Sequence, residues 1–195
     1  MKEARLIGLT GGIGSGKSVV ARVLRLKGYR VYDCDMEAKR LMEQSERIVS
    51  GLTDRFGKDC YTEEGHLNRP FLAEKIFNDK EDREWLNHLV HSAVRDDLVR
   101  WLYERKGISF VESAILHTSS LDEYCNQVWV VDAPLELRID RAMMRGGIDL
   151  NNLLARIESQ RGELEEIDGE KIRIINNSGS ESLLLQIDLL LDKTE

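Results

Sequence analysis

Short apolar runs of strand length alternate along this chain with segments whose apolar residues recur at helical spacing. The first run ends in a glycine cluster, residues 18–27 then carry valine and leucine at helical spacing, and Gly28 ends that segment. The same pattern predicts strands at 5–9, 30–33, 108–112, 128–132 and 172–176, and further helices at 35–44, 81–106, 134–145, 150–161 and 181–192. Strands that alternate with helices form a parallel sheet covered on both faces, whose ligands bind at the carboxyl ends of the strands.

Length and composition narrow the class of protein. The 195 residues predict one domain, and no apolar run approaches the ~20 residues that a membrane span requires. Charges at Lys2, Glu3 and Arg5 do not fit a secretory signal, so we expect a cytoplasmic protein. Its three cysteines lie far apart, which favours reduced, buried thiols, and a net charge of −7 disfavours nucleic-acid binding.

A phosphate-binding motif occupies the first strand-to-helix turn. Residues 11–18 read GGIGSGKS and fit the pattern G-x-x-x-x-G-K-S/T. Glycines let backbone N–H groups wrap an anion, Lys17 bridges the terminal phosphates and the Ser18 hydroxyl ligates Mg²⁺. The motif assigns ATP contacts to Gly12, Ile13, Gly14, Ser15, Gly16, Lys17, Ser18 and Val19. It predicts a nucleotide site without fixing the reaction, although the guanine-reading Asn-Lys-x-Asp of GTPases is absent.

Asp33 and Asp35 stand at and just past the end of the predicted strand 30–33. In the ordinary strand order this end lies beside the P-loop, where a carboxylate accepts the proton of an attacking hydroxyl. The alternative for Asp33 is the N-cap of the following helix. Asp35 directly precedes Met36 and Glu37, so we expect Asp35 to be the cap and Asp33 to be available for chemistry.

Arginines gather in the segment between positions 134 and 161, which holds five of them and no lysine. Arg138, Arg141 and Arg145 are three and four residues apart and therefore share one helix face. Such a group suits phosphate recognition, and two helices meeting at glycines 146 and 147 resemble a lid that excludes water. The alternative is a solvated face neutralised by nearby acids.

His88 and His91 are three apart on the long helix without a third ligand, so we expect no metal site there.

Over nearly its whole length the chain resembles the dephospho-coenzyme A kinase family. The resemblance rests on six parts of the chain. They are residues 7–18 (IGLTGGIGSGKS), 31–35 (VYDCD) with 38–41, 65–69 (GHLNR), the arginines at 138, 141 and 145, residues 156–160 and residues 175–179 (INNSG). Three positions depart from the family pattern: Ser92 follows His91 where proline is usual, residues 112–116 read ESAIL where the family has an Asp-x-Pro-Leu-Leu-like segment with a later Glu, and Arg138 replaces a common glutamine.

The resemblance implies an α/β P-loop kinase of three layers that uses ATP and Mg²⁺ to phosphorylate the ribose 3′-hydroxyl of dephospho-coenzyme A. It implies Asp33 as general base, Arg141 and Arg145 in the lid, and Asn177 near the adenine. The remaining residues that it places on the substrate side are Thr10, Arg69, His91 and Glu112.

The expected single domain has a core at about 1–50, 107–133 and 166–195, a helical substrate-binding region at about 54–106 and a lid at about 134–165. We expect a monomer or weak homo-oligomer that contacts neither nucleic acid nor membrane. Two alternatives remain: another small-molecule or nucleotide kinase with the same core, and a non-catalytic ATP-sensing module.

Overall fold

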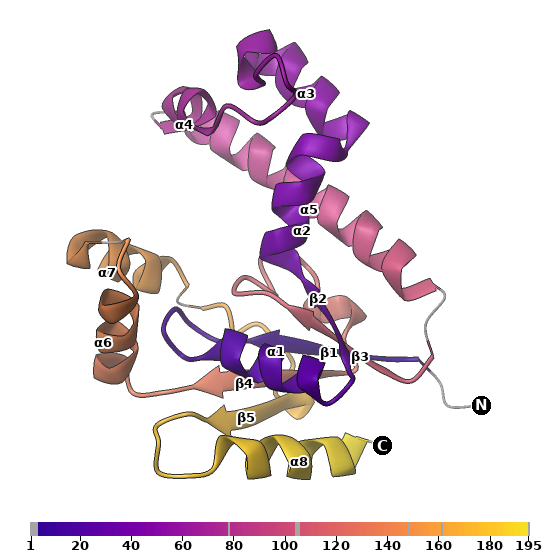
Figure 1. Ribbon diagram of the computed structural model, residues 1–195, viewed down its shortest axis with the longest axis vertical. Coiled ribbons are helices and arrows are strands. Elements are labelled where there is room, and N and C mark those ends of the chain that lie inside the picture. Colours follow the sequence, from indigo (N-terminus) through magenta and orange to yellow (C-terminus); the bar gives the residue numbers. More distant parts are fainter. Residues whose placement is uncertain (1–3, 78, 104–105, 148, 161, 195) are drawn as a thin grey trace. The chain divides into compact units, whose positions relative to one another are not determined.

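The computed structural model describes residues 4–77, 79–103, 106–147, 149–160 and 162–194. The chain divides into two compact units, a sheet unit of residues 1–33 and 105–195 and a helical unit of residues 34–104. Figure 1 shows both units, and each is described by itself. We had expected the substrate-binding region to begin near residue 54; the helical unit begins at Cys34.

The sheet unit is built on five parallel strands in the order β2-β3-β1-β4-β5. Its strands are β1 (Arg5–Thr10), β2 (Arg30–Asp33), β3 (Ile108–Glu112), β4 (Gln127–Asp132) and β5 (Ile172–Asn176). Its helices are α1 (Lys17–Leu26), α6 (Leu135–Arg145), α7 (Leu150–Ser159) and α8 (Leu183–Thr194), with 3-10 turns at Asp122–Tyr124 and Gly169–Lys171. Every strand therefore ends at the same edge as β1, where the P-loop begins.

The core of the sheet unit lies between the sheet and the two helices α1 and α8, which Figure 1 shows on one side of the strands. Its buried members, contributed by these two helices and by strands β1, β3, β4 and β5, are Ile7, Leu9, Val20, Ala21, Leu24, Phe110, Trp129, Val131, Ile175, Ile187 and Leu191. Burial of each large apolar side chain stabilises the fold by about 1.5–3 kcal/mol. This packing fixes α1, and with it the P-loop, against the end of β1.

The opposite face of the sheet is covered in part by the connection between β3 and β4. Gly8 leaves room for it, since an added Cβ would lie 2.6 Å from Leu116 and 3.1 Å from the Cys125 sulfur. All three cysteines are free and buried, as predicted. Burial raises the pKa of the Cys60 thiol, and that of Cys125 to about 12, so neither thiol ionises readily near neutral pH.

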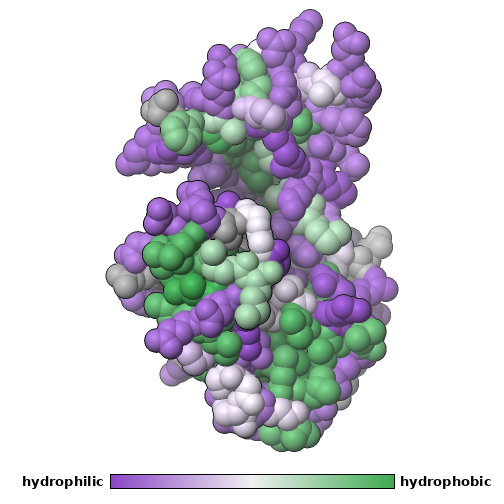
Figure 2. All heavy atoms as spheres, turned by 60° about the vertical axis from the view of Figure 1, so that its left-hand side comes forward, coloured by the Kyte–Doolittle hydropathy of each residue, from purple (hydrophilic) through white to green (hydrophobic). Residues whose placement is uncertain are grey.

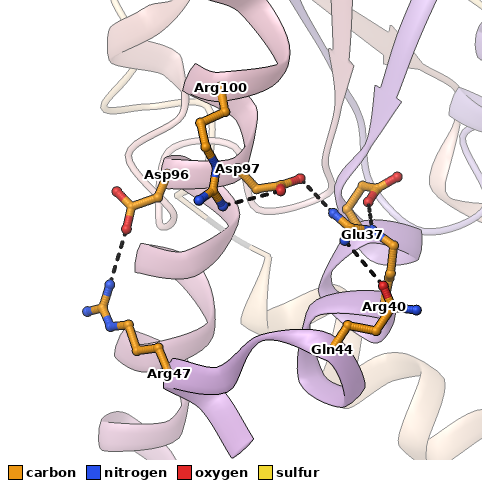
Figure 3. A network of polar contacts seen from close by, with 7 residues as sticks. All are labelled: Glu37, Arg40, Gln44, Arg47, Asp96, Asp97 and Arg100. Atoms are coloured by element: carbon orange, nitrogen blue, oxygen red, sulfur yellow. Dashed lines mark hydrogen bonds and ion pairs between the residues drawn. The ribbon is translucent and has the colours of Figure 1, made fainter.

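The helical unit contains α2 (Cys34–Gln44), α3 (Glu46–Phe56), α4 (Arg69–Phe77) and α5 (Lys80–Tyr103), with a 3-10 turn at Lys58–Cys60. Its buried apolar side chains include Leu41, Ile48, Leu52, Leu72, Leu86 and Leu98. Arg40 contacts Glu37 at 2.5 Å and Asp97 at 2.9 Å, and Arg47 contacts Asp96 at 3.1 Å (Figure 3). The pair with Glu37 lies within α2, whereas the pairs with Asp97 and Asp96 join α2 and α3 to α5.

The predicted α/β class with a parallel sheet is confirmed, and β2, β3 and β5 match their predicted residues. The sequence pattern did not predict separate helices at 46–56 and 69–77, which form α3 and α4. Pro70 is the second residue of α4, a position where the missing N–H costs no helical hydrogen bond. Arg161, one of the five clustered arginines, lies outside the described residues.

Hydrophobic side chains are distributed unequally over the surface. Figure 2 shows hydrophobic patches on the sheet unit, whereas the helical unit presents mainly hydrophilic side chains in that view. The exposed apolar residues of α8 are Leu184, Leu185 and Leu189. Among the described residues, no helix is both long enough and apolar enough to cross a bilayer.

Candidate active site

The P-loop runs from the end of β1 into the first residue of α1, Lys17. Gly14 and Gly16 have positive φ angles of 78° and 96°, conformations that favour glycine. Gly16 occupies the N-cap position and no side chain caps α1. The N–H groups of the first helical turn therefore face the loop without a side-chain acceptor, which is the arrangement that binds anions at helix N-termini.

Helix α6 packs directly on the P-loop. A Cβ added to Gly14 would collide with the Arg138 carbonyl oxygen and lie 2.9 Å from the Arg138 Cα. A Cβ on Gly12 would meet the Arg138 guanidinium. These glycines thus let backbone and side chain of α6 approach closely, in addition to any contact with phosphate.

Ile13, at the tip of the loop, is held by one side chain from α6 and one from the end of α7. The Gln160 Oε1 atom accepts a hydrogen bond from the Ile13 N–H at 3.0 Å, and Arg138 Nε donates to the Ile13 carbonyl at 3.1 Å. Gln160 is the C-cap of α7 and Arg138 lies on α6. The α6–α7 pair is therefore joined to the P-loop by oriented hydrogen bonds.

Asn177, which follows β5, connects three elements. Its side chain donates to the Ser15 carbonyl at 2.7 Å, and its N–H donates to the Asp132 carbonyl at 2.7 Å. Arg141 Nη2 donates to the Asn177 carbonyl at 2.9 Å. Two buried polar atoms beside this group, Arg141 Nη1 and Ser15 Oγ, have no hydrogen-bond partner within the described part of the chain.

Two carboxylates and two cations lie together where β2 and β3 end. Asp33 and Glu112 are directly paired across the two strands. Lys17 Nζ lies 3.3 Å from Glu112 Oε1, and Arg25 Nη2 lies 3.7 Å from Glu112 Oε2 and 3.8 Å from Asp33 Oδ2. Glu112 is only 6% exposed, so its charge is held in place by these cations rather than by water.

The strand order changes how Asp33 relates to the P-loop. β3 lies between β2 and β1, so Glu112, and not Asp33, ends the strand next to the P-loop. Our expectation that Asp35 caps the next helix is wrong: α2 begins at Cys34, which puts Asp33 at the N-cap position and Asp35 inside the first turn. A role as helix cap thus stays open for Asp33 beside the chemical one.

Comparisons with known proteins agree with this geometry. The family model described as dephospho-CoA kinase matches residues 5–182. The chain belongs to the dephospho-CoA kinase family. This family phosphorylates dephospho-CoA in the last step of coenzyme A synthesis, with ATP as the nucleotide substrate.

Individual dephospho-CoA kinases match over most of their length. One from Porphyromonas gingivalis is 42% identical over 158 residues, which are 80% of this chain and 78% of that protein. One from Idiomarina loihiensis is 32% identical over 179 residues, or 90% and 87% of the two chains.

Solved structures agree on the fold. TT1252 from Thermus thermophilus is 33% identical with a TM-score of 0.77 and covers 98% of this chain and 96% of its own. A dephospho-CoA kinase from Campylobacter jejuni, 24% identical, matches with a TM-score of 0.68 over 99% of this chain and 97% of its own, which bears on the fold alone.

The remaining predicted site residues fall into both units. Thr10 is the buried last residue of β1, whereas Ser18 and Val19 are exposed in the first turn of α1, and Arg145 is exposed at the end of α6. Arg69, exposed at the start of α4, and His91, half-buried on α5, belong to the helical unit. Within the described ranges no cluster of three or more His, Cys, Asp or Glu side chains forms a metal site.

Two charged residues near the site were not predicted. Arg25 lies in the last turn of α1, where a basic residue is common because it complements the helix dipole. Glu163 lies in a polar stretch that has the composition of a surface loop, yet it is only 7% exposed. No signal in the spacing separated either residue from ordinary surface charge, since their partners are distant in sequence.

Proposed function

We propose that this chain transfers the γ-phosphoryl group of ATP to the ribose 3′-hydroxyl of dephospho-CoA, giving coenzyme A and ADP. The observation that carries the proposal is the paired Asp33 and Glu112 at the carboxyl edge of the sheet, with the P-loop residue Lys17 3.3 Å from Glu112. A base, an anion-binding loop and a cation in one place are what phosphoryl transfer to a hydroxyl requires.

The site suits a nucleoside triphosphate. The uncapped N-terminus of α1 supplies N–H donors, and Lys17 adds a positive charge. Arg141 Nη1 is buried and has no hydrogen-bond partner among the described atoms, so this charged donor is available to a ligand oxygen. We assign Arg141 and Arg145 to the phosphates, and Asn177, which already holds the P-loop through Ser15, to the adenine side.

We assign the general-base role to Asp33. As the 3′-oxygen bonds to the γ-phosphorus, the bond from that phosphorus to the bridging oxygen of ADP breaks, and Asp33 takes the hydroxyl proton. Arg25, 3.8 Å from Asp33 and 3.7 Å from Glu112, counteracts the repulsion between the two carboxylates. Glu112 in turn keeps the Lys17 ammonium beside the P-loop, where charge develops during transfer.

Magnesium is assigned to the Ser18 hydroxyl, in the first turn of α1. Mg²⁺ is ordinarily held by few protein ligands together with substrate phosphates, and one hydroxyl at the P-loop with carboxylates nearby fits that pattern. When bound, the ion neutralises charge on the phosphate oxygens.

Thr10 and Glu112 in the sheet unit, and Arg69 and His91 in the helical unit, are assigned to dephospho-CoA. We further propose that the reaction takes place in the cytoplasm, which the three free cysteines support.

The test is a turnover assay with ATP and Mg²⁺ in which coenzyme A is detected by mass and ADP by a coupled reaction. Dephospho-CoA is compared with a nucleoside monophosphate as acceptor. We expect coenzyme A and ADP in equal amounts, and Lys17→Ala to lower kcat by about 10²–10³-fold. ADP without coenzyme A, or faster turnover of another acceptor, would contradict the proposal, and tight ATP binding without transfer would indicate a sensing module.

A further inference from the structure

Glu163 is a buried carboxylate in the sheet unit that the proposed chemistry does not use. It lies just past the end of α7 and its residue is 7% exposed. A buried carboxylate is costly unless hydrogen bonds replace its lost water. Among the described residues, the side-chain carboxylate of Glu163 receives its hydrogen bonds from the connection that follows β3.

Three hydrogen bonds join Glu163 to that connection. Its Oε2 atom accepts from the His117 N–H at 3.1 Å and from the Thr118 N–H at 3.3 Å, and its Oε1 atom accepts from the Thr118 hydroxyl. His117 and Thr118 lie 46 and 45 positions before Glu163 in the sequence, so these contacts exist only in the folded chain.

The connection that Glu163 holds begins in the active site. Glu112, which contacts Lys17, is the last residue of β3, and the next residue, Ser113, donates its N–H to the Leu9 carbonyl at 3.1 Å. From there to residue 121 the chain forms a tight turn with its own hydrogen bonds, such as Ser119 N–H to the Ile115 carbonyl at 3.0 Å. A short, internally bonded turn transmits a displacement at its far end to its start.

The same turn contains a strained residue. Ser120 has a φ of 54°, the only positive φ of a non-glycine residue in the described ranges. Such a conformation costs free energy and persists only where neighbouring contacts enforce it. Glu163 contacts Thr118 and His117, two and three residues before Ser120.

A second contact connects the same lid segment to the P-loop. Gln160, three residues before Glu163, accepts from the Ile13 N–H at 3.0 Å. Gln160 and Glu163 both line a cavity of about 270 Å³ whose other walls include Gly11, Gly12 and Ala114. The segment after α7 therefore contacts two loops that meet at this cavity. Gln160 contacts the P-loop, and Glu163 contacts the connection after β3.

We propose that Glu163 is a positioning residue for phosphoryl transfer: it fixes the turn after β3 against the lid and so keeps Glu112 beside Lys17. This rests on the proposed function of the site. Glu163 acts through hydrogen bonds, not through its charge. A glutamine fulfils the same role, because its oxygen accepts from the two N–H groups while its NH₂ donates to the Thr118 hydroxyl, which rotates to accept.

The experiment compares Glu163→Ala, Glu163→Gln and Glu165→Ala, a matched control two residues away with an exposed side chain. We expect Glu163→Ala to lower kcat for coenzyme A formation by about 10–100-fold, with Glu163→Gln within about threefold of wild type and Glu165→Ala unchanged. Calorimetric titration with ADP counts the molecules that remain competent to bind, which separates slow turnover from misfolding.

Three results would overturn the inference: equal kcat for Glu163→Ala and Glu165→Ala, a Glu163→Gln variant as slow as Glu163→Ala, or a loss of kcat matched by a loss of ADP-binding molecules. Amide hydrogen exchange tests the inference independently of turnover. Residues 113–119 should exchange faster in Glu163→Ala than in Glu165→Ala, and equal exchange would show that Glu163 does not fix the turn after β3. If wild type forms no coenzyme A, the proposed function fails, while the exchange result still decides whether Glu163 fixes this turn.

Discussion

Charged side chains have different surroundings in the two units. In the sheet unit, Glu112 and Glu163 are 6% and 7% exposed and each is fixed by partners from distant parts of the chain. In the helical unit, Arg47 and Asp96 form an ion pair although their side chains are 54% and 64% exposed. Figure 3 shows such pairs along α2, α3 and α5.

The difference shows where electrostatics fixes geometry. Surface ion pairs contribute about 0–1 kcal/mol each because water and salt screen them. A buried carboxylate is strongly destabilising when its partners are removed, so its position is well defined. The sheet unit therefore holds precisely placed charges suited to catalysis, whereas the pairs of the helical unit mainly tie neighbouring helices together.

The largest expected effect concerns Asp33. Asp33→Ala should lower kcat by about 10²-fold or more with ATP affinity nearly unchanged, because a base acts on the acceptor. Asp33→Asn retains a helix-cap acceptor but cannot take the proton. Equal loss of kcat in both variants supports the base, whereas recovery of activity in Asp33→Asn would assign Asp33 to capping. Asp96→Ala, on the surface of α5, serves as the control.

Two glycines with similar backbone angles compare the units directly. Gly14 and Gly65 have φ angles of 78° and 84°, but no described atom lies within 4 Å of a Cβ added to Gly65, whereas one on Gly14 meets α6. Gly65→Ala should cost about 1–2 kcal/mol of unfolding free energy from backbone strain alone. Gly14→Ala should cost about 2–3 kcal/mol or more and weaken ATP binding, since α6 must move. Denaturant titrations measure both, and equal losses would contradict the close packing of α6.

A smaller effect is expected for the ion pair between Arg40 and Asp97 in the helical unit. The hydrogen bond from Arg40 to Glu37 raises the pKa of Arg40, although partial desolvation acts to lower it. The guanidinium therefore stays charged. A double-mutant cycle with Arg40→Ala and Asp97→Ala should give a coupling of about 0.5–1 kcal/mol that falls in high salt. A coupling that salt leaves unchanged would show that this pair resembles the buried charges of the sheet unit.

The smallest effect concerns His117. A hydrogen bond from its ring to Asp122 at 3.0 Å raises the pKa of His117, with further support from Glu163 and Glu166. The resulting stabilisation is full below the unfolded pKa of about 6.5 and is lost as pH rises through the higher folded pKa. Relative to His117→Gln, the free energy of unfolding of wild type should be higher by less than about 1 kcal/mol at pH near 5.5 and no higher at pH near 8.5. An advantage that is the same at both pH values would exclude this linkage.

Much of the sheet unit could be predicted from sequence because its signals are local. Three strands have their predicted boundaries, and the helix predicted at residues 18–27 after the P-loop is α1, which begins one residue earlier, at Lys17. The helical unit was predicted less well: α4 escaped notice since Leu72 is its one buried residue, too few to produce an amphipathic pattern. Asp35 was taken for a cap because a one-residue shift of a helix start cannot be read from composition.

By itself the sequence determined the fold class, the nucleotide loop and the family, since each depends on residues close together along the chain. Tertiary structure alone decided that β3 separates β2 from the P-loop, that Glu112 thereby meets Lys17, and that Gln160 and Glu163 contact two different loops. These relations join residues 45 to 147 positions apart. Strand order and long-range packing set them, and local spacing does not encode either.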